Sequence, residues 1–232
     1  MEEDLDIVYE DNHVIVVIKP QNVPSQEDET GDEDMLTKVK KYIKIKYQKP
    51  NNVFVGLVHR LDRPTGGLMV FAKTSKAASR LSSQIQDGVM SKRYLTVLTG
   101  VPTDRHKRQI NYLKKDEKTN TVKIALMGES NAKKAELIYN VLAVEDGLSL
   151  TEIELITGRS HQIRVQMASI KCPVYGDSKY NKNIKSNMTK NLALWAYKLT
   201  FEHPTTKQIM TFKCYPNEDV EPWNKFNLEK LI

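Results

Sequence analysis

Hydrophobic and polar residues alternate along this chain in short blocks that predict a largely antiparallel sheet. Residues 7–18 read IVYEDNHVIVVI, two β-branched runs around the turn formers Asp11 and Asn12, and this pattern predicts a hairpin. Residues 114–120, KKDEKTN, predict the tip of another hairpin. Further strands are expected where apolar residues cluster or alternate, at 53–58, 68–72, 94–98, 121–125, 135–144, 148–156 and 192–201.

Three segments have the apolar spacing of helices instead. Residues 35–48 carry an apolar stripe that ends before Pro50. Ser75 is expected to cap a second helix, which ends before Gly88, and Ser160 to cap a third. Helices that flank a large antiparallel sheet define an α+β fold, which we expect to form a single domain over residues 1–232.

The composition indicates a cytoplasmic protein. A chain of 232 residues can bury a substantial core. Its two cysteines, Cys172 and Cys214, form no C-x-x-C pair, so free thiols in a reducing compartment are expected. The N-terminus is acidic where a signal peptide is basic, and no apolar run is long enough to span a membrane.

Charge is distributed unevenly along the chain. The net charge is +6, yet residues 1–34 contain twelve Asp or Glu against a single lysine, Lys19. Residues 90–134, which include Lys92 and Arg93, hold eleven Lys or Arg against four acids. Such a basic segment favours a polyanion such as RNA as partner. The alternative is a lysine-rich surface that only keeps the protein soluble.

One loop presents a single acid between two cations. Residues 59–67 read HRLDRPTGG, which places Asp62 between Arg60 and Arg63. Nearby guanidinium groups favour the ionised carboxylate, a form that suits a nucleophile or a base rather than a general acid. Gly66 and Gly67 permit a tight turn that leaves room for a ligand. A surface salt-bridge cluster is the alternative interpretation.

A second polar cluster, TGRSHQIR at residues 157–164, stands where a strand gives way to a helix. It supplies Arg159, His161, Gln162 and Arg164 close to a helix N-terminus, where anions such as phosphate are favoured. A well-capped helix with a solvated basic first turn is the alternative.

Together these segments resemble the signature motifs of the RluA-type pseudouridine synthases. HRLDRPTGGLMVFAKT, KRYLTV and TGRSHQIRVQMA occur in the order and at the spacing of that family. The motifs VIVVIKP, PVYGDSKY and LALWAYKLTFEHP extend the resemblance over residues 7–215. The resemblance implies the pseudouridine synthase fold. It also implies an isomerase that breaks the C1′–N1 bond of a uridine in RNA and joins C1′ to C5.

The resemblance assigns three catalytic residues. Asp62 takes the place of the catalytic aspartate, which either attacks covalently or removes a sugar proton, and the sequence does not choose between these roles. Tyr94 matches the tyrosine that packs on the target base, and Arg164 matches the arginine that pairs with the aspartate. Arg60 matches the arginine that enters the RNA where the uridine has been flipped out.

Further RNA-contacting or supporting residues are expected around these three. They are His59, Arg63, Lys92, Arg93, Arg159 and Gln162.

Two departures from the family bear on these expectations. Thr65-Gly66-Gly67 stands where many members read T-S-G, which should alter a turn rather than the reaction. Many relatives also carry an N-terminal RNA-binding domain of the S4 type, and none is expected here, so target recognition falls to the catalytic domain and its basic segment.

The expected partner is a structured ribosomal or transfer RNA. The isomerisation is redox-neutral, so no cofactor and no metal are expected, and the histidines and cysteines lack ligand spacing. We expect a monomer. The alternative function is an RNA-binding or RNA-folding factor that has the same fold but no catalysis.

Overall fold

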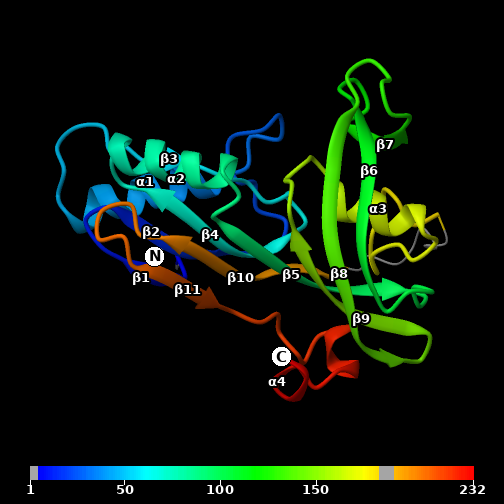
Figure 1. Cartoon of the computed structure of the whole chain (residues 1–232). Helices are drawn as coiled ribbons and strands as arrows, with labels where there is room; N and C mark the ends of the chain where they lie inside the picture. The colour runs from blue at the N-terminus through cyan, green and yellow to red at the C-terminus, as the bar shows by residue number, and fades with distance from the viewer. Residues whose placement is uncertain (1–4, 183–190) are drawn as a thin grey trace. The chain divides into compact units, whose positions relative to one another are not determined.

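The computed structural model describes residues 5–182 and 191–232, and the chain divides into two compact units. Unit 1 comprises Met1–Ser91 and Ala196–Cys214, whereas unit 2 comprises Lys92–Trp195 and Tyr215–Ile232. The main chain thus passes from one unit to the other three times, and neither unit is a continuous segment of sequence (Figure 1).

Unit 1 combines a sheet with two helices. Its elements are β1 (Ile7–Glu10), β2 (Val14–Lys19), α1 (Met35–Lys46), β3 (Gly56–Leu57), β4 (Gly66–Ala72), α2 (Ser75–Gln86), β10 (Leu194–Glu202) and β11 (Ile209–Lys213). The first two residues of β10 belong to unit 2. Neighbouring strands follow the order β1-β2-β4-β10-β11, and β3 pairs with the end of β4. Pairs β1–β2, β2–β4, β3–β4 and β10–β11 are antiparallel.

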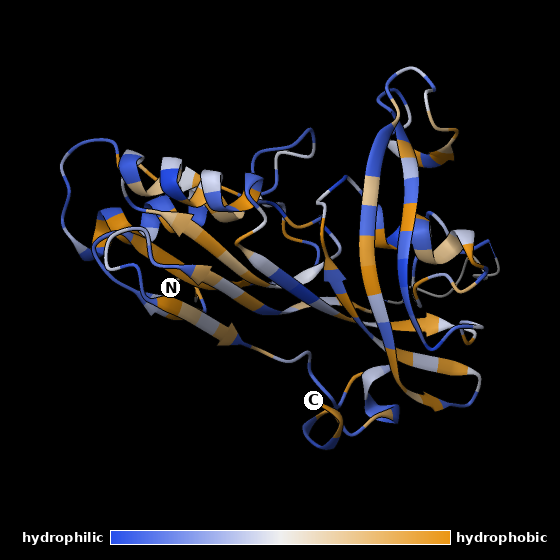
Figure 2. Cartoon of the chain, in the orientation of Figure 1, coloured by the Kyte–Doolittle hydropathy of each residue, from blue (hydrophilic) through white to orange (hydrophobic). Residues whose placement is uncertain are grey.

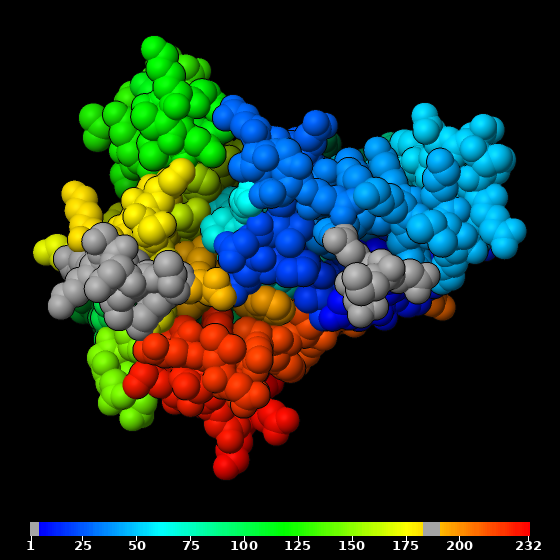
Figure 3. All heavy atoms as spheres, turned by 180° about the vertical axis from the view of Figure 1, so that it is seen from behind, coloured from blue at the N-terminus to red at the C-terminus, as the bar shows by residue number. Residues whose placement is uncertain are grey.

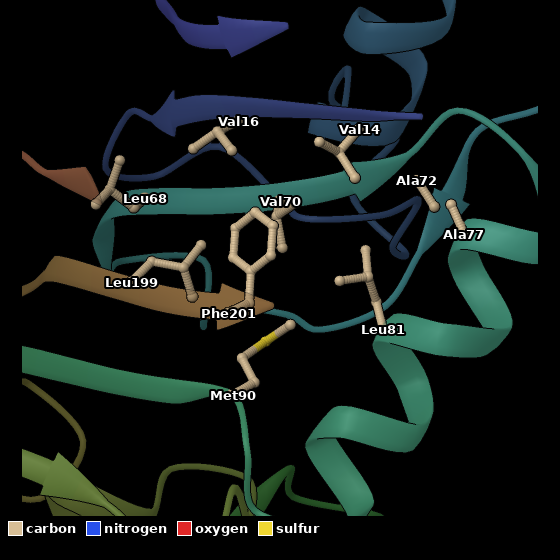
Figure 4. Packing of buried hydrophobic residues seen from close by; sticks show 10 residues of the cluster. All are labelled: Val14, Val16, Leu68, Val70, Ala72, Ala77, Leu81, Met90, Leu199 and Phe201. Carbon is tan, nitrogen blue, oxygen red and sulfur yellow. The ribbon is translucent and has the colours of Figure 1, made fainter. Parts of the chain in front are cut away.

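The core of unit 1 joins the strands to one side of α2. Phe201 of β10 lies among Val70 of β4, Leu81 of α2 and Met90, as Figure 4 shows. The full cluster contains Val14, Val16, Leu68, Val70, Ala72, Ala77, Leu81, Met90, Leu199 and Phe201. All seven residues of β4 are buried, which is typical of a strand covered on both faces.

Unit 2 contains a second run of antiparallel strands. Its elements are β5 (Ser91–Thr99), β6 (His106–Asp116), β7 (Thr121–Ala125), β8 (Lys133–Glu145), β9 (Leu148–Leu155), α3 (Gln162–Ser169), η1 (Trp223–Lys225) and α4 (Leu228–Leu231). The first residue of β5 belongs to unit 1. The strand order is β5-β9-β8-β6-β7, and each neighbouring pair is antiparallel.

Helix α3 covers one face of these strands. Its Val165 packs against Leu113, Val122 and Ala135. The opposite face is more polar, and Figure 2 accordingly shows blue and orange alternating along β6 and β8. The last residues of the chain, red in Figure 3, lie against the turn between β8 and β9, where Lys225 Nζ is 2.6 Å from Asp146 Oδ2.

Most elements expected from the hydrophobic pattern are confirmed. The hairpin at 7–18 is β1–β2, and strand β7 has the predicted bounds. Helices α1 and α2 form where the apolar stripes predict them, although α1 ends two residues early, at Lys46. The α+β class with a mainly antiparallel sheet is confirmed, whereas the single domain stays a prediction.

Three expectations about strands were wrong or incomplete. Only Gly56–Leu57 of the strand expected at 53–58 forms, since Phe54 is exposed and Gly56 packs closely under Ala78. Strands β6 and β11 were missed because β6 reads largely polar and buries few of its side chains, while β11 is only five residues long. The hairpin tip is shorter than expected, because β6 continues to Asp116.

Both expected helix caps were also wrong. Thr74 rather than Ser75 caps α2, with its hydroxyl accepting from Ala77 N at 3.1 Å. Helix α3 is preceded by His161, whose φ is +51° and whose side chain makes no capping hydrogen bond.

Candidate active site

The loop that carries Asp62 leads into β4, and its main chain is held by hydrogen bonds from residues 19–25. Asn22 N donates to Arg63 O at 2.8 Å, and Gln21 Nε2 donates to Pro64 O at 3.0 Å. Within the loop, Thr65 N donates to Asp62 O at 2.9 Å and closes a turn. Main-chain hydrogen bonds therefore hold the conformation that follows Asp62.

The residue before Asp62 is held just as firmly. Ser25 Oγ donates to Leu61 O at 2.7 Å, and Leu61 N donates back to Ser25 Oγ at 3.1 Å. Ser25 and Leu61 are both buried. Asp62 itself is half-buried, so the loop displays a carboxylate between two fixed stretches of main chain.

Lys19 is a buried cation beneath this loop. Its side chain is fully buried, and Nζ donates to the carbonyl oxygens of Pro20 at 2.8 Å, Val23 at 2.7 Å and Arg63 at 2.9 Å. Burial lowers the pKa of Lys19 to about 7, although the negative charge of Asp62 opposes this shift. Lys19 thus links the segment of Pro20 and Val23 to the loop at Arg63, and in its protonated form it places a positive charge near Asp62. Sequence reasoning did not single it out.

The two arginines beside Asp62 differ in their surroundings. Arg60 is exposed. The guanidinium of Arg63 instead reaches the acidic segment 26–34, where it contacts Asp28, Thr30 and Asp32. The picture of two guanidinium groups around Asp62 therefore needs correction, because Arg63 pairs with acids of another segment.

Two further residues of the motif have structural contacts. His59 Nε2 accepts a hydrogen bond from Val70 N at 3.1 Å, so this nitrogen carries no proton. Gly67 has φ +116°, and a Cβ there would lie 2.4 Å from Ala196 O of β10. Only glycine fits this close approach.

Unit 2 carries the other two predicted catalytic residues, and both lie on one face of its sheet. Tyr94 of β5 is opposite Ile153, which is opposite Tyr139 in turn, so these side chains share a face. Helix α3, which contains Arg164, covers this same face, because Gln109 of β6 donates to the Gln166 carbonyl there at 3.2 Å. Tyr94 is 6% exposed.

Arg164 has a partner that sequence reasoning missed. Its Nε and Nη2 donate to the two carboxylate oxygens of Asp177, at 2.8 and 2.7 Å, and only 7% and 0% of the two side chains is exposed. The guanidinium also lies over the ring of Tyr180, 5.1 Å from its centre. The Tyr180 hydroxyl is 2.7 Å from His161 Nδ1. The available signal was the motif PVYGDSKY, which contains both Asp177 and Tyr180.

Lys92 and Arg93, adjacent in β5, point to opposite faces of the sheet. Lys92 shares the face of Tyr94, and burial lowers its pKa. Arg93 instead pairs with Glu152 at 3.2 Å and with Glu154 at 3.0 Å, both on β9. Contact of Lys92 and Arg93 with RNA stays a prediction, and the ion pairs of Arg93 lie on the face opposite Tyr94.

The start of α3 is organised by Gln162. This side chain is 3% exposed; its Oε1 accepts from Arg159 N at 3.0 Å and from Thr157 Oγ1 at 2.8 Å, while its Nε2 donates to Glu136 O at 3.0 Å. Gln162 is therefore a supporting residue in this structure. Arg159 is exposed, with its Nε donating to Lys134 O at 2.9 Å.

The described residues contain no cluster of metal ligands and no membrane-spanning helix. Within residues 5–182 and 191–232, no three His, Cys, Asp or Glu side chains are grouped as metal ligands would be. No helix in the described part of the chain has the length and apolarity to cross a membrane. Cys172 and Cys214 are free thiols.

Comparison with known proteins gives a consistent result. The sequence model of the RNA pseudouridylate synthase family matches residues 13–169. The dual-specificity RNA pseudouridine synthase RluA of Haemophilus ducreyi is 31% identical over 218 residues, which cover 91% of this chain and 93% of that protein. An uncharacterized RNA pseudouridine synthase of Mycoplasma pneumoniae is 34% identical over 90% of this chain, which spans 66% of that protein's length.

Solved structures show the same fold. Human RNA pseudouridylate synthase domain containing 4 superimposes with a TM-score of 0.76 at 22% identity, and the match covers 91% of this chain and 89% of the human one.

Proposed function

Because the chain belongs to the RNA pseudouridylate synthase family and is of the RluA type, we propose that it isomerises uridine to pseudouridine in a structured RNA, with Asp62, Tyr94 and Arg164 as catalytic residues. The observation that carries the proposal is the display of Asp62 on a loop whose main chain is fixed on both sides. A carboxylate held in this way is preorganised to meet a flipped nucleotide.

The reaction conserves the atoms of the nucleotide apart from exchange of protons with water. The C1′–N1 bond breaks, the uracil turns, and C5 bonds to C1′; the proton on C5 leaves and N1 gains one. Asp62 either forms a transient covalent bond or removes a sugar proton, and both roles use the ionised carboxylate. The Tyr94 hydroxyl is the candidate to accept the C5 proton, while its ring packs on the base.

Arg164 is proposed to balance the charge of Asp62. Asp177 engages the edge of the Arg164 guanidinium formed by Nε and Nη2. The salt bridge with Asp177 would thereby orient the arginine. Arg60 is proposed to fill the space left by the flipped base, and the basic residues between 90 and 134 to contact the phosphates of ribosomal or transfer RNA. A cytoplasmic monomer without metal or cofactor remains part of the proposal.

Tritium release tests the proposal. Total RNA labelled with tritium at uracil C5, from cells that lack this gene, is incubated with wild type, with Asp62→Asn and with the control Asp6→Asn, an exposed aspartate of the same unit. Release by Asp62→Asn should fall by at least about a thousandfold, because the group that acts on the sugar is lost. Asp6→Asn should match wild type.

RNA affinity separates catalysis from binding. Asp62→Asn should bind RNA nearly as well as wild type, because the cations that dominate affinity remain. A folded wild-type protein that binds RNA yet releases no tritium would refute the isomerase and favour the RNA-binding or RNA-folding factor.

A further inference from the structure

The acidic segment 26–34 contains six Asp or Glu in nine residues, in a protein whose net charge is positive. Such a segment repels the phosphates of RNA, yet the structure places it against the loop of Asp62. The contact is made through Arg63, the residue that directly follows Asp62. The reaction proposed above uses no residue of this acidic segment.

The contacts on Arg63 are those of an anion site already filled. Nη1 is 2.6 Å from Thr30 Oγ1 and 3.5 Å from Asp28 Oδ2, while Nη2 pairs with Asp32. A guanidinium presents the same planar set of donors to a carboxylate and to a phosphate. The side chains of Asp28 and Asp32 therefore hold Arg63 as a phosphate group would.

The acids are held in place by the structure of the segment itself. Thr30 N and Oγ1 donate to Asp28 Oδ1, at 3.0 and 2.5 Å. The segment begins directly after Ser25, whose hydroxyl is hydrogen-bonded to Leu61. It ends at Asp34, which caps α1 by accepting a hydrogen bond from Thr37 N at 3.1 Å. The segment is thus anchored on the active loop and on a helix of the same unit.

Accepting the proposed function, we infer that Asp28 and Asp32 compete with an RNA phosphate for Arg63, so that RNA must displace them to reach this cation. The competition lowers the affinity of every RNA by a similar factor. The ratio of affinities between two RNAs is then unchanged, but an RNA that makes few contacts elsewhere becomes too weak to stay bound, whereas one with many contacts still binds.

A matched pair of double variants tests this competition. Asp28→Asn with Asp32→Asn removes two charges that contact Arg63, and Glu27→Gln with Glu29→Gln removes two charges from exposed residues of the same segment. Both are compared with wild type for binding to a fluorescently labelled, uridine-containing RNA hairpin over a range of salt concentrations. Thermal unfolding confirms that each variant is folded, and the single variants of Asp28 and Asp32 replace the double one if it is not.

The aspartate variant should bind the hairpin about fivefold more tightly at low salt, because two exposed ion pairs no longer oppose RNA. Its plot of log affinity against log salt should steepen by about one, as expected for one more phosphate contact. The glutamate variant should change affinity less than about twofold, since separated surface charges are screened. In an Arg63→Gln background, the aspartate changes should likewise alter affinity by less than about twofold.

Three results would overturn the inference: equal tightening by both double variants, weaker binding by the aspartate variant, or a gain that persists without Arg63. These readouts need no turnover. Failure of tritium release in wild type would remove the isomerase, whereas failure of the matched comparison would remove only the competition for Arg63.

Discussion

The two units hold their proposed catalytic residues in different ways. In unit 1, side chains and N–H groups of residues 19–25 bind the main chain on both sides of Asp62. In unit 2, Arg164 is held through its own side chain, by the carboxylate of Asp177 and the ring of Tyr180. In unit 1, hydrogen bonds hold the main chain around the proposed catalytic residue. In unit 2, an ion pair and a ring contact hold its side chain.

This difference determines which substitutions each site tolerates. Replacing Asp62 leaves the main-chain hydrogen bonds of its loop in place, so loss of activity there should not entail loss of folding. Replacing either member of the Arg164–Asp177 pair leaves the other as a buried group without its partner. The following variants test the comparison, from the largest expected effect to the smallest.

Asp177→Ala should be the most destabilising variant. It leaves the buried guanidinium of Arg164 without its carboxylate, which is expected to lower the free energy of unfolding by about 3–5 kcal/mol. Denaturant unfolding measures the change. The control is Asp104→Ala, an exposed aspartate of the same unit that pairs with Lys107, for which the loss should be under about 1 kcal/mol. Equal losses in the two variants would contradict a special role for the buried pair.

Lys19→Met should have an intermediate effect on stability and change its dependence on pH. The variant removes the donor shared by three carbonyl groups, which should lower the free energy of unfolding by about 1–3 kcal/mol. The folded protein gives up the Lys19 proton near pH 7, whereas the unfolded chain keeps it to about pH 10.5. The unfolded state therefore binds more protons between these values, and Lys19 makes stability rise with pH there.

The expected slope from Lys19 is at most about 1.4 kcal/mol per pH unit, and it should be absent from Lys19→Met. Urea unfolding of both proteins at several pH values between 7 and 10 measures it. Parallel pH profiles for wild type and variant would show that Lys19 keeps its proton throughout this range.

Arg93→Gln should have the smallest effect. Arg93 pairs with Glu152 and Glu154 on the face opposite Tyr94, so RNA affinity should change by less than about twofold. Lys92→Gln, on the face of Tyr94, should weaken binding and reduce the salt slope by about one. Fluorescence anisotropy with an RNA hairpin compares the two variants, and a greater loss for Arg93→Gln would restore the original expectation for that residue.

Local patterns predicted most of the fold because most elements bury an apolar face. The β-branched run of β2 and the apolar stripe of α1 are examples. Strand β6 escaped prediction because it reads HKRQINYLKKD and buries only Gln109 and Leu113. A strand that buries only two side chains against a helix has a sequence pattern of hydrophobic and polar residues much like that of a polar loop.

The site was predictable where its chemistry lies within one motif. Asp62 follows from HRLDRPTGG, and its place on a fixed loop agrees with the glycines and proline around it. The residues that hold this loop could not be predicted. Lys19 and Ser25 lie about forty residues away in the sequence, and they bind main-chain atoms, which carry no sequence signal. The partner of Arg164 was hidden for a similar reason, since only the folded chain brings Asp177 to it.

The threading of the chain through two units also constrains the order of assembly during translation. Residues 196–214 supply the last two strands of unit 1 and, with Phe201, part of its core. Until the ribosome has released them, β4 has an unpaired edge and the core beside it is incomplete. The first ninety residues must therefore stay unaggregated while more than a hundred others emerge from the ribosome. A fragment truncated before β10 would lack the strands that complete unit 1.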